Sequence, residues 1–245
     1  LERGVLTALA LIGRLPGEWK ELWQWLHPQF ASQVEQQPWH SGYSSPLPWW
    51  MQPDGLSDFA ECLQAGLASA GVRLIGIFCR AVFADEFNTL VEASNKADAL
   101  SRITLALVHD ALHSIPSDRT HVFCDKHGGR DYYLPLLQQQ FPDPWIEIRR
   151  ESEAESVYRF GGAERPIEIG FYVGGERFLP VALASMTSKY VRETAMRPFN
   201  EFWCGRVPGL KPTAGYPTDS RRFKKQIAVV QQELEIDDRI LWRSR

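Results

Sequence analysis

The amino-acid sequence predicts a mixed α/β domain in which helices and strands pack in layers. Short apolar runs rich in β-branched and aromatic residues, such as residues 72–80 and 120–124, are typical of strands. Longer segments, such as residues 98–113, repeat apolar residues at helical spacing. Because strand-like and helix-like segments are mixed along the chain, we expect a sheet flanked by helices.

The other elements follow from the same two patterns. Apolar residues at helical spacing predict further helices at residues 1–12, 17–27, 58–70, 85–91, 132–140, 181–198 and 220–234. Apolar runs predict further strands at residues 145–149, 155–160 and 166–173. The last two strands flank Gly161 and Gly162, which favour a tight turn, so we expect a hairpin. We expect Leu56 and Ser57 to cap the helix that follows them.

The composition bounds the class of protein. The chain has 245 residues, of which 44% are hydrophobic and 23% charged, as in soluble globular proteins. It contains no run of about 18 apolar residues, so we expect no membrane partner. The four cysteines lie far apart without a C-x-x-C pair, which favours reduced thiols in the cytoplasm over a zinc site or disulfides. We expect one domain over residues 1–245, and, because the chain begins with Leu1, further sequence upstream.

Tryptophan and proline concentrate near the N-terminus. Six of the nine tryptophans lie in residues 19–50, and prolines interrupt residues 28–56. We interpret residues 19–56 as an irregular insertion that is anchored by its own small aromatic core. The alternative is a platform for base stacking or for docking of a protein partner.

Positive charge collects in the C-terminal part of the chain. Residues 1–118 carry 7 Lys or Arg against 13 Asp or Glu, whereas residues 192–245 carry 11 against 7. The net charge of −3 argues against a nonspecific nucleic-acid coat. A polyanion would therefore meet residues 192–245, which we expect to be a basic helical part. A solvated basic helix face is the alternative.

Two carboxylates follow predicted strands. Asp125 ends the strand at residues 120–124, and Glu176 follows the strand at residues 166–173 and a glycine pair. Ligands gather at the carboxyl ends of strands in α/β sheets, and Mg²⁺ prefers one or two carboxylates with phosphate oxygens and waters. Asp125 and Glu176 are therefore candidate metal ligands. The structural alternatives are a helix cap for Asp125 and a helix-dipole partner for Glu176.

Two motifs follow one another in the last third of the chain. The first reads A-S-x-x-S-K-x-x-R-E over residues 184–193, and the second is G-Y-P-T at residues 215–218. Together they resemble the type 2 ribonuclease H family, in which a helix with the first motif precedes a basic G-Y-[GP]-T motif. Asp125 and Glu176 fall where that family keeps its third and fourth metal-binding carboxylates. The resemblance covers roughly residues 72–235.

This resemblance implies a ribonuclease H-like fold and cleavage of RNA in RNA–DNA hybrids, or at ribonucleotides in DNA, with Mg²⁺ or Mn²⁺. Asp125 and Glu176 would be catalytic metal ligands. Tyr216 matches the family tyrosine that stacks at the junction between ribonucleotide and deoxyribonucleotide. The other residues that match the motifs would bind the nucleic acid, and they are Ser185, Lys189, Arg192, Lys211, Gly215 and Thr218.

The chain differs from that family in its carboxylates. It contains no D-E-A-G motif, which supplies the family's first two, and it has Glu176 where the family has aspartate. We therefore expect the 245-residue chain to lack two catalytic carboxylates and to show little nuclease activity. The alternative function is a noncatalytic relative that binds nucleic acid or protein on the same scaffold.

Three further sets of residues are weaker candidates. His109 and His113 share a helical spacing that metals use, but no H-E-x-x-H motif surrounds them, so we interpret them as surface histidines. His127 follows Asp125 closely and is a candidate for proton transfer near neutral pH. An acidic segment is either a source of replacement metal ligands or a solvated turn, and it contains Glu151, Glu153 and Glu155.

Overall fold

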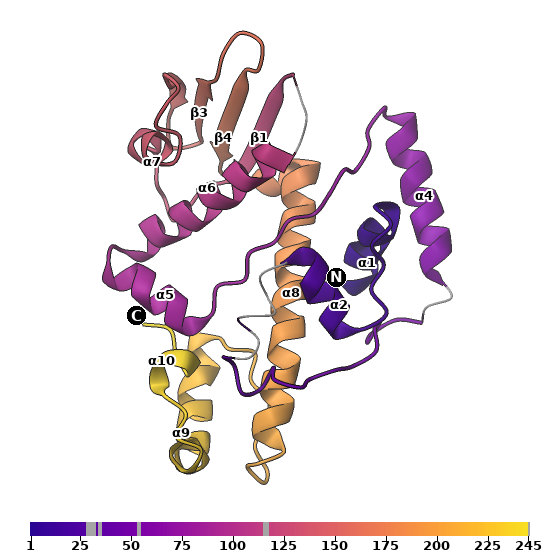
Figure 1. The fold of residues 1–245 in the computed structure, drawn as a ribbon, viewed down its shortest axis with the longest axis vertical. Helices are drawn as coiled ribbons and strands as arrows, with labels where there is room; N and C mark the ends of the chain where they lie inside the picture. Colours follow the sequence, from indigo (N-terminus) through magenta and orange to yellow (C-terminus); the bar gives the residue numbers. More distant parts are fainter. Residues whose placement is uncertain (28–32, 34–35, 53–54, 115–117, 245) are drawn as a thin grey trace. The chain divides into compact units, whose positions relative to one another are not determined.

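The computed structural model describes residues 1–27, 33, 36–52, 55–114 and 118–244. These residues combine helices with one four-stranded sheet, so the mixed α/β class is confirmed (Figure 1). The chain divides into two compact units. Unit 1 comprises Leu1–Asp85 and Met186–Arg243, and unit 2 comprises Glu86–Ser185 with Ser244. The single domain expected from the sequence stays a prediction.

Unit 2 contains the sheet, whose strand order is β1-β4-β3-β2. β1 (Thr120–Asp125) pairs in parallel with β4 (Ile167–Tyr172). β4 pairs antiparallel with β3 (Glu155–Phe160), which pairs antiparallel with β2 (Glu147–Glu151) at the other edge. The predicted hairpin is therefore confirmed as β3 and β4. The turn between them contains Gly161 at a φ of 87°, a conformation that favours glycine.

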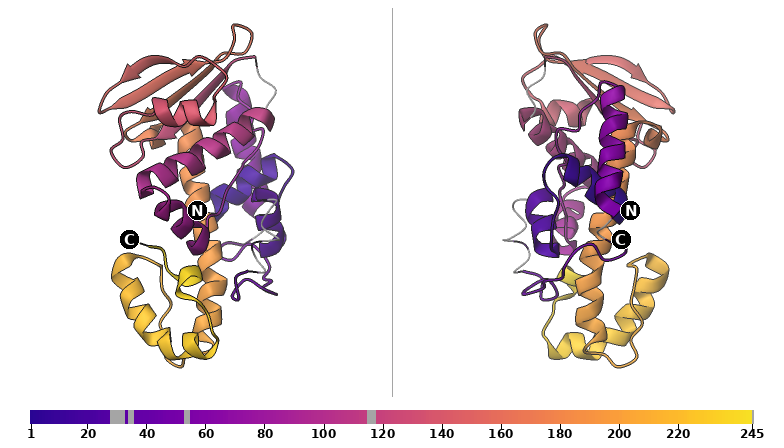
Figure 2. Two further views of the ribbon diagram at one scale, coloured as in Figure 1. Left: turned by 60° about the vertical axis from the view of Figure 1, so that its left-hand side comes forward. Right: turned by 90° about the vertical axis from the view of Figure 1, so that its right-hand side faces the viewer.

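Helices cover one face of this sheet. α6 (Lys96–Ser114) and α7 (Leu134–Gln140) contribute Leu105 and Leu137 to a buried cluster that also contains Phe171 of β4. Figure 2 shows both helices beside the sheet. Because successive side chains of a strand point to opposite faces, the neighbours of such buried residues point away from these helices.

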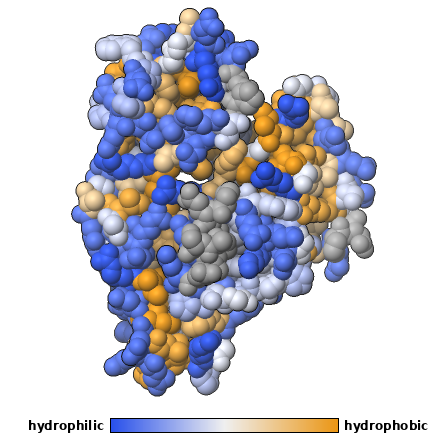
Figure 3. Space-filling view, in the orientation of Figure 1, coloured by the Kyte–Doolittle hydropathy of each residue, from blue (hydrophilic) through white to orange (hydrophobic). Residues whose placement is uncertain are grey.

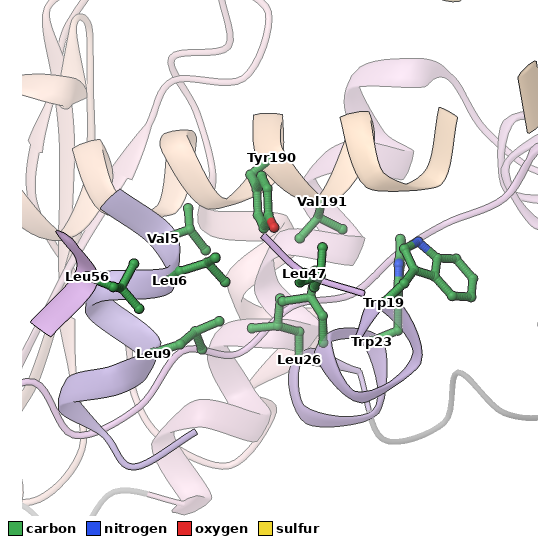
Figure 4. Close-up of a cluster of buried hydrophobic side chains, with 11 residues drawn as sticks. Val5, Leu6, Leu9, Trp19, Trp23, Leu26, Leu47, Leu56, Tyr190 and Val191 are labelled. Carbon is green, nitrogen blue, oxygen red and sulfur yellow. The ribbon is translucent and has the colours of Figure 1, made fainter. Parts of the chain in front are cut away.

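Unit 1 is mainly helical in its described residues. Its elements are α1 (Glu2–Leu11), α2 (Trp19–Leu26), α4 (Leu56–Ser69), most of α8 (Leu179–Cys204), α9 (Pro217–Glu233) and α10 (Asp238–Leu241). In a first buried cluster, Tyr190 of α8 lies beside Val5 and Leu6 of α1 (Figure 4). Trp19 and Trp23 of α2 belong to the same cluster. These tryptophans therefore serve as core, but the expected separate core of the insertion is wrong, because they pack with α1 and α8.

A second cluster of unit 1 packs α9 against α8. Its largest members are Trp39, Phe199, Trp203 and Phe223. Trp39 of the tryptophan-rich segment thus joins the C-terminal helices. Apolar side chains also gather on the surface over α9 (Figure 3), where Val229 is 69% exposed.

A buried carboxylate ties the N-terminus to two other segments of unit 1. Glu2 is 4% exposed, and its oxygens accept the backbone N–H groups of Trp49 and Trp50 at 2.8 and 2.6 Å. The hydroxyl of Tyr190 donates to the same carboxylate at 3.1 Å. A buried charge is tolerated where its oxygens have such donors. Burial, with Glu2 beside it, raises the pKa of Tyr190, so this hydroxyl keeps its proton.

α8 continues well beyond its predicted end at Pro198. A proline inside a helix leaves the carbonyl four residues earlier without its usual donor, and here that carbonyl belongs to Thr194. The indole Nε1–H of Trp19 donates to it at 2.8 Å. Because a buried tryptophan replaces the missing donor, the helix extends to Cys204.

The predicted strand at residues 72–80 is wrong. Residues 72–80 have no regular secondary structure and pair with no strand in the part of the chain that the structure describes. Instead, the N–H of Cys79 donates to the carbonyl of Leu26 at 3.0 Å, and Ile77 packs on the first cluster. The apolar residues of this segment that face the cluster are therefore half-buried against helices instead of a sheet.

Smaller differences concern a helix cap and the segment that follows α2. Leu56 and Ser57 lie inside α4, whose cap residue is Gly55 without a side-chain hydrogen bond. The predicted irregular segment at residues 28–56 lies partly outside the described residues. α5 (Ala84–Glu92) matches its prediction. Among the described helices, none has the length and apolar character that crossing a bilayer requires.

We predict that Glu2→Ala lowers the free energy of unfolding by about 1–3 kcal/mol, because the N–H groups of Trp49 and Trp50 lose their acceptor. Denaturation followed by tryptophan fluorescence measures this loss, since every tryptophan except Trp145 lies in unit 1. The matched control is Glu61→Ala at an exposed position of α4. Equal stability of the Glu2→Ala and Glu61→Ala variants would contradict the prediction.

Candidate functional site

Parallel pairing brings the ends of β1 and β4 to one edge of the sheet. Asp125, the last residue of β1, lies opposite Tyr172, the last residue of β4. Glu176 lies in the short 3-10 helix η2 (Gly175–Arg177) just beyond β4. The backbone N–H of Gly175 donates to Oδ1 of Asp125 at 2.9 Å. The turn that carries Glu176 is thereby tied to Asp125.

This close approach depends on the glycine pair. A Cβ at position 175 would lie 3.2 Å from both Cα and Oδ1 of Asp125, which is tighter than ordinary contact. Gly174 adopts a φ of 63°, a conformation that favours glycine. The two glycines therefore build the turn between β4 and Glu176.

Both carboxylates are exposed. The hydroxyl of Ser185 donates to Glu176. The helix-cap alternative for Asp125 is wrong, since α7 begins at Leu134 with no side-chain cap. The helix-dipole alternative places Glu176 in the first turn of the helix that follows. Glu176 instead lies in η2, and the first turn of α8 contains no acidic residue.

A pair of exposed carboxylates suits one hard divalent cation that completes its coordination with water and phosphate oxygens. No group of three or more His, Cys, Asp or Glu side chains in the described residues is placed to hold a metal ion. The structure thus places two exposed carboxylates, those of Asp125 and Glu176, near the ends of β1 and β4.

His127 holds the loop that follows Asp125. Its side chain is buried, and its Nδ1 lies 3.0 Å from the hydroxyl oxygen of Ser101 in α6. Its backbone N–H donates to the hydroxyl of Tyr133 at 2.9 Å. Burial lowers the pKa of His127 to about 4, and the positive charge of Arg130 acts in the same direction. The imidazole is therefore neutral at pH 7, which argues against the predicted role in proton transfer.

A second group of predicted residues lies in unit 1, around Tyr216. This side chain is 59% exposed, and its residue forms the N-cap of α9, where its carbonyl accepts the N–H groups of Asp219 and Ser220 at 3.0 and 2.9 Å. The guanidinium of Arg192 lies 4.6 Å from the centre of the Tyr216 ring and donates to the carbonyl of Ala214. The ring is thus held at the surface and is not core.

Side chains also hold the backbone of the second motif. Asn200 of α8 donates to the carbonyl of Thr213 at 3.0 Å and accepts its N–H at 2.8 Å. The N–H of Gly215 donates to the Thr213 hydroxyl at 3.0 Å, and Gly215 has a φ of 72°. The guanidinium of Arg222 donates to the carbonyl of Lys211 at 3.2 Å. These bonds make the turn before α9 a defined structure.

The first motif exposes its cations and buries its apolar residues. Lys189 and Arg192 are three residues apart on α8 and are both exposed. Tyr190 and Val191 are buried in the first cluster. The predicted residues thus form two groups, namely Asp125, Glu176 and Ser185 in unit 2, and Lys189, Arg192, Lys211, Gly215 and Tyr216 in unit 1. The side chain of Thr218 lies outside the described part of the chain.

The weaker candidates have structural partners. Nδ1 of His113 lies 2.8 Å from the carbonyl oxygen of His109, one helical turn away. The carboxylate of Glu151 accepts the hydroxyl of Tyr158, and Glu155 forms an ion pair with an arginine of β2. Glu151 and Glu155 therefore stabilise the pairing of β2 with β3, and the acidic segment forms no cluster of ligands in the described residues.

Comparisons of the chain with protein-family models, with curated proteins and with solved structures found no match. A functional proposal therefore rests on the sequence motifs and on the geometry of the two groups.

We predict that the imidazole of His127 titrates near pH 4, well below its ordinary pKa of 6.5. As the pH falls below 6.5, the unfolded chain binds this proton before the folded chain does, so stability declines between about pH 6.5 and 4, by on the order of 3 kcal/mol. Histidine NMR with His127→Gln to assign the signal measures the pKa. A signal that titrates near 6.5 would contradict the prediction.

Proposed function

We propose that this chain is ribonuclease H-like and acts on RNA–DNA hybrids or on DNA that contains ribonucleotides. One observation carries the proposal: β1 and β4 are parallel neighbours, and the turn after β4 brings Glu176 to the end of β1, where its neighbour Gly175 donates to Asp125. Carboxylates at one sheet edge are the ligands that metal-dependent phosphodiester hydrolysis requires. The sheet, with one parallel pair, a hairpin and flanking helices, is compatible with a ribonuclease H-like fold.

In this proposal Asp125 and Glu176 hold one Mg²⁺ or Mn²⁺. Gly175 engages one oxygen of Asp125, which leaves the other oxygen for the ion. Ser185 orients Glu176 through its hydroxyl. When bound, the ion supplies charge that polarises a substrate phosphate.

The group around Tyr216 would bind the nucleic acid. An exposed aromatic ring stacks on a base with about 1–3 kcal/mol, and the 2′-hydroxyl is what distinguishes RNA from DNA beside it. Arg192 holds the ring from one side. The exposed side chains of Lys189 and Lys211 would neutralise phosphates.

A second candidate function is binding of nucleic acid without cleavage. It is favoured by the finding that the described residues form no group of three or more metal-ligating side chains. The two candidate functions share Tyr216 and the cationic side chains of Lys189, Arg192 and Lys211. They differ in whether a divalent ion leads to cleavage of the bound strand. A protein partner at the tryptophan-rich segment, where Trp50 is 56% exposed, and a cytoplasmic location stay proposals.

We predict that Tyr216→Ala weakens binding of a duplex with one ribonucleotide by about 5- to 150-fold, because the stacked ring is lost. Fluorescence anisotropy compares this duplex with an RNA–DNA hybrid and an all-DNA duplex of the same sequence. Because Tyr216 is exposed, its removal should leave the melting temperature within a few degrees.

The matched control is Trp145→Ala, which removes an aromatic ring that is 86% exposed in unit 2. This variant should bind all three duplexes as the unaltered chain does. The proposal fails if the unaltered chain binds all-DNA duplex as tightly as the other two, or if Tyr216→Ala binds like Trp145→Ala.

A further inference from the structure

The face of the sheet opposite α6 and α7 carries aromatic side chains next to Asp125. Phe123 lies two residues before Asp125 on β1, so both side chains point to this face. The ring centre of Phe123 lies 6.0 Å from that of Tyr172 on β4 and 4.5 Å from that of Phe178. Tyr172 and Phe178 are 4.9 Å apart. We call Phe123, Tyr172 and Phe178 the aromatic platform.

A glycine lets the aromatic platform lie across two strands. Gly170 of β4 is opposite Phe123 of β1 in the parallel register. A Cβ at position 170 would overlap the ring of Tyr172. The absence of a side chain therefore allows Tyr172 to lie back over β4 toward Phe123. On the other side of Gly170, Val157 of β3 continues the same face.

The aromatic platform is accessible and carries a positive charge. Its three rings are half-buried, and the adjoining Val173 and Leu179 are 56% and 61% exposed. The guanidinium of Arg177 lies 5.4 Å from the ring centre of Tyr172 and 4.8 Å from that of Phe178. Flat rings beside an arginine are the combination with which proteins bind bases and phosphates of single strands.

We propose that the aromatic platform stacks unpaired nucleobases of a single-stranded segment of the substrate, while Arg177 contacts its phosphates. This inference rests on the proposed function, because it names the part of the nucleic acid that lies beside Asp125. Paired bases hide their faces in the helix stack, whereas unpaired bases offer them to aromatic side chains. A platform next to the carboxylates would hold a strand end or overhang close to the bound ion.

The test uses a short fluorescent oligonucleotide and an abasic analogue that has the same phosphates and no bases. The unaltered chain should bind the base-carrying strand about 5- to 150-fold more tightly than the analogue. In a Tyr216→Ala background, which removes the other proposed stacking ring, Phe123→Leu should remove most of this preference and leave the affinity for the analogue unchanged, and Phe123→Trp should restore it. Arg177→Gln, at an exposed position, should weaken binding of both strands.

Phe141→Leu is the matched control, because Phe141 packs with the cluster on the opposite face of the sheet. In the same background it should keep the preference for bases even if it costs as much stability as Phe123→Leu. Equal binding of both strands by the unaltered chain would overturn the inference and favour an apolar protein segment as the occupant. A preference that survives Phe123→Leu in the Tyr216→Ala background would also overturn it.

A blunt RNA–DNA hybrid separates this inference from the proposed function. Such a hybrid has no unpaired bases, so its binding should not change in Phe123→Leu. Loss of hybrid recognition with a retained preference for bases would overturn the proposed function alone. Retained hybrid recognition without a preference for bases would overturn this inference alone.

Discussion

The parallel pairing of β1 with β4 is the constraint on which the carboxylate group depends. Its register puts Asp125 opposite Tyr172 and brings Gly175 within hydrogen-bonding distance of Asp125. A slip of one residue would turn every side chain of β1 to the other face. Cys124, whose burial raises its pKa to about 12, would then leave the core. Burial on one face therefore fixes the position of the carboxylate on the other.

The residues around Tyr216 show the same dependence of an exposed group on buried contacts. α8 is anchored by Tyr190 to the buried carboxylate of Glu2 and by Trp19 to the carbonyl freed by Pro198. Each such hydrogen bond adds about 1 kcal/mol to stability. Because α8 is fixed, Arg192 already holds the Tyr216 ring in place before the proposed nucleic acid binds. The ring then loses little freedom on binding, which lowers the entropic cost of that binding.

Local signals in the sequence predicted where helices and strands form better than which elements pack against one another. The glycines between β3 and β4 and the strand that ends at Asp125 identified the hairpin and the candidate ligand, because turn chemistry acts over a few residues. The apolar pattern of residues 72–80 did not show whether a sheet or a helix would cover it. The contact between His127 and Ser101, 26 residues apart, has no signal in a single sequence. The two-residue spacing of Phe123 and Asp125, which puts both side chains on one face of a strand, did offer a signal for the aromatic platform. The role of Gly170 appears only in the folded chain.

The central proposal is that Asp125 and Glu176 bind one divalent ion together. Mn²⁺ titration followed by electron paramagnetic resonance measures it directly, with Asp125→Asn, Glu176→Gln, the double variant, and Glu164→Gln at an exposed position as control. If the ion is shared, each single change weakens Mn²⁺ binding and the double change adds little more, so that the two effects fall short of additivity by about 0.5–3 kcal/mol. Additive losses, or Mn²⁺ binding that matches the Glu164→Gln control in all variants, would contradict the proposal.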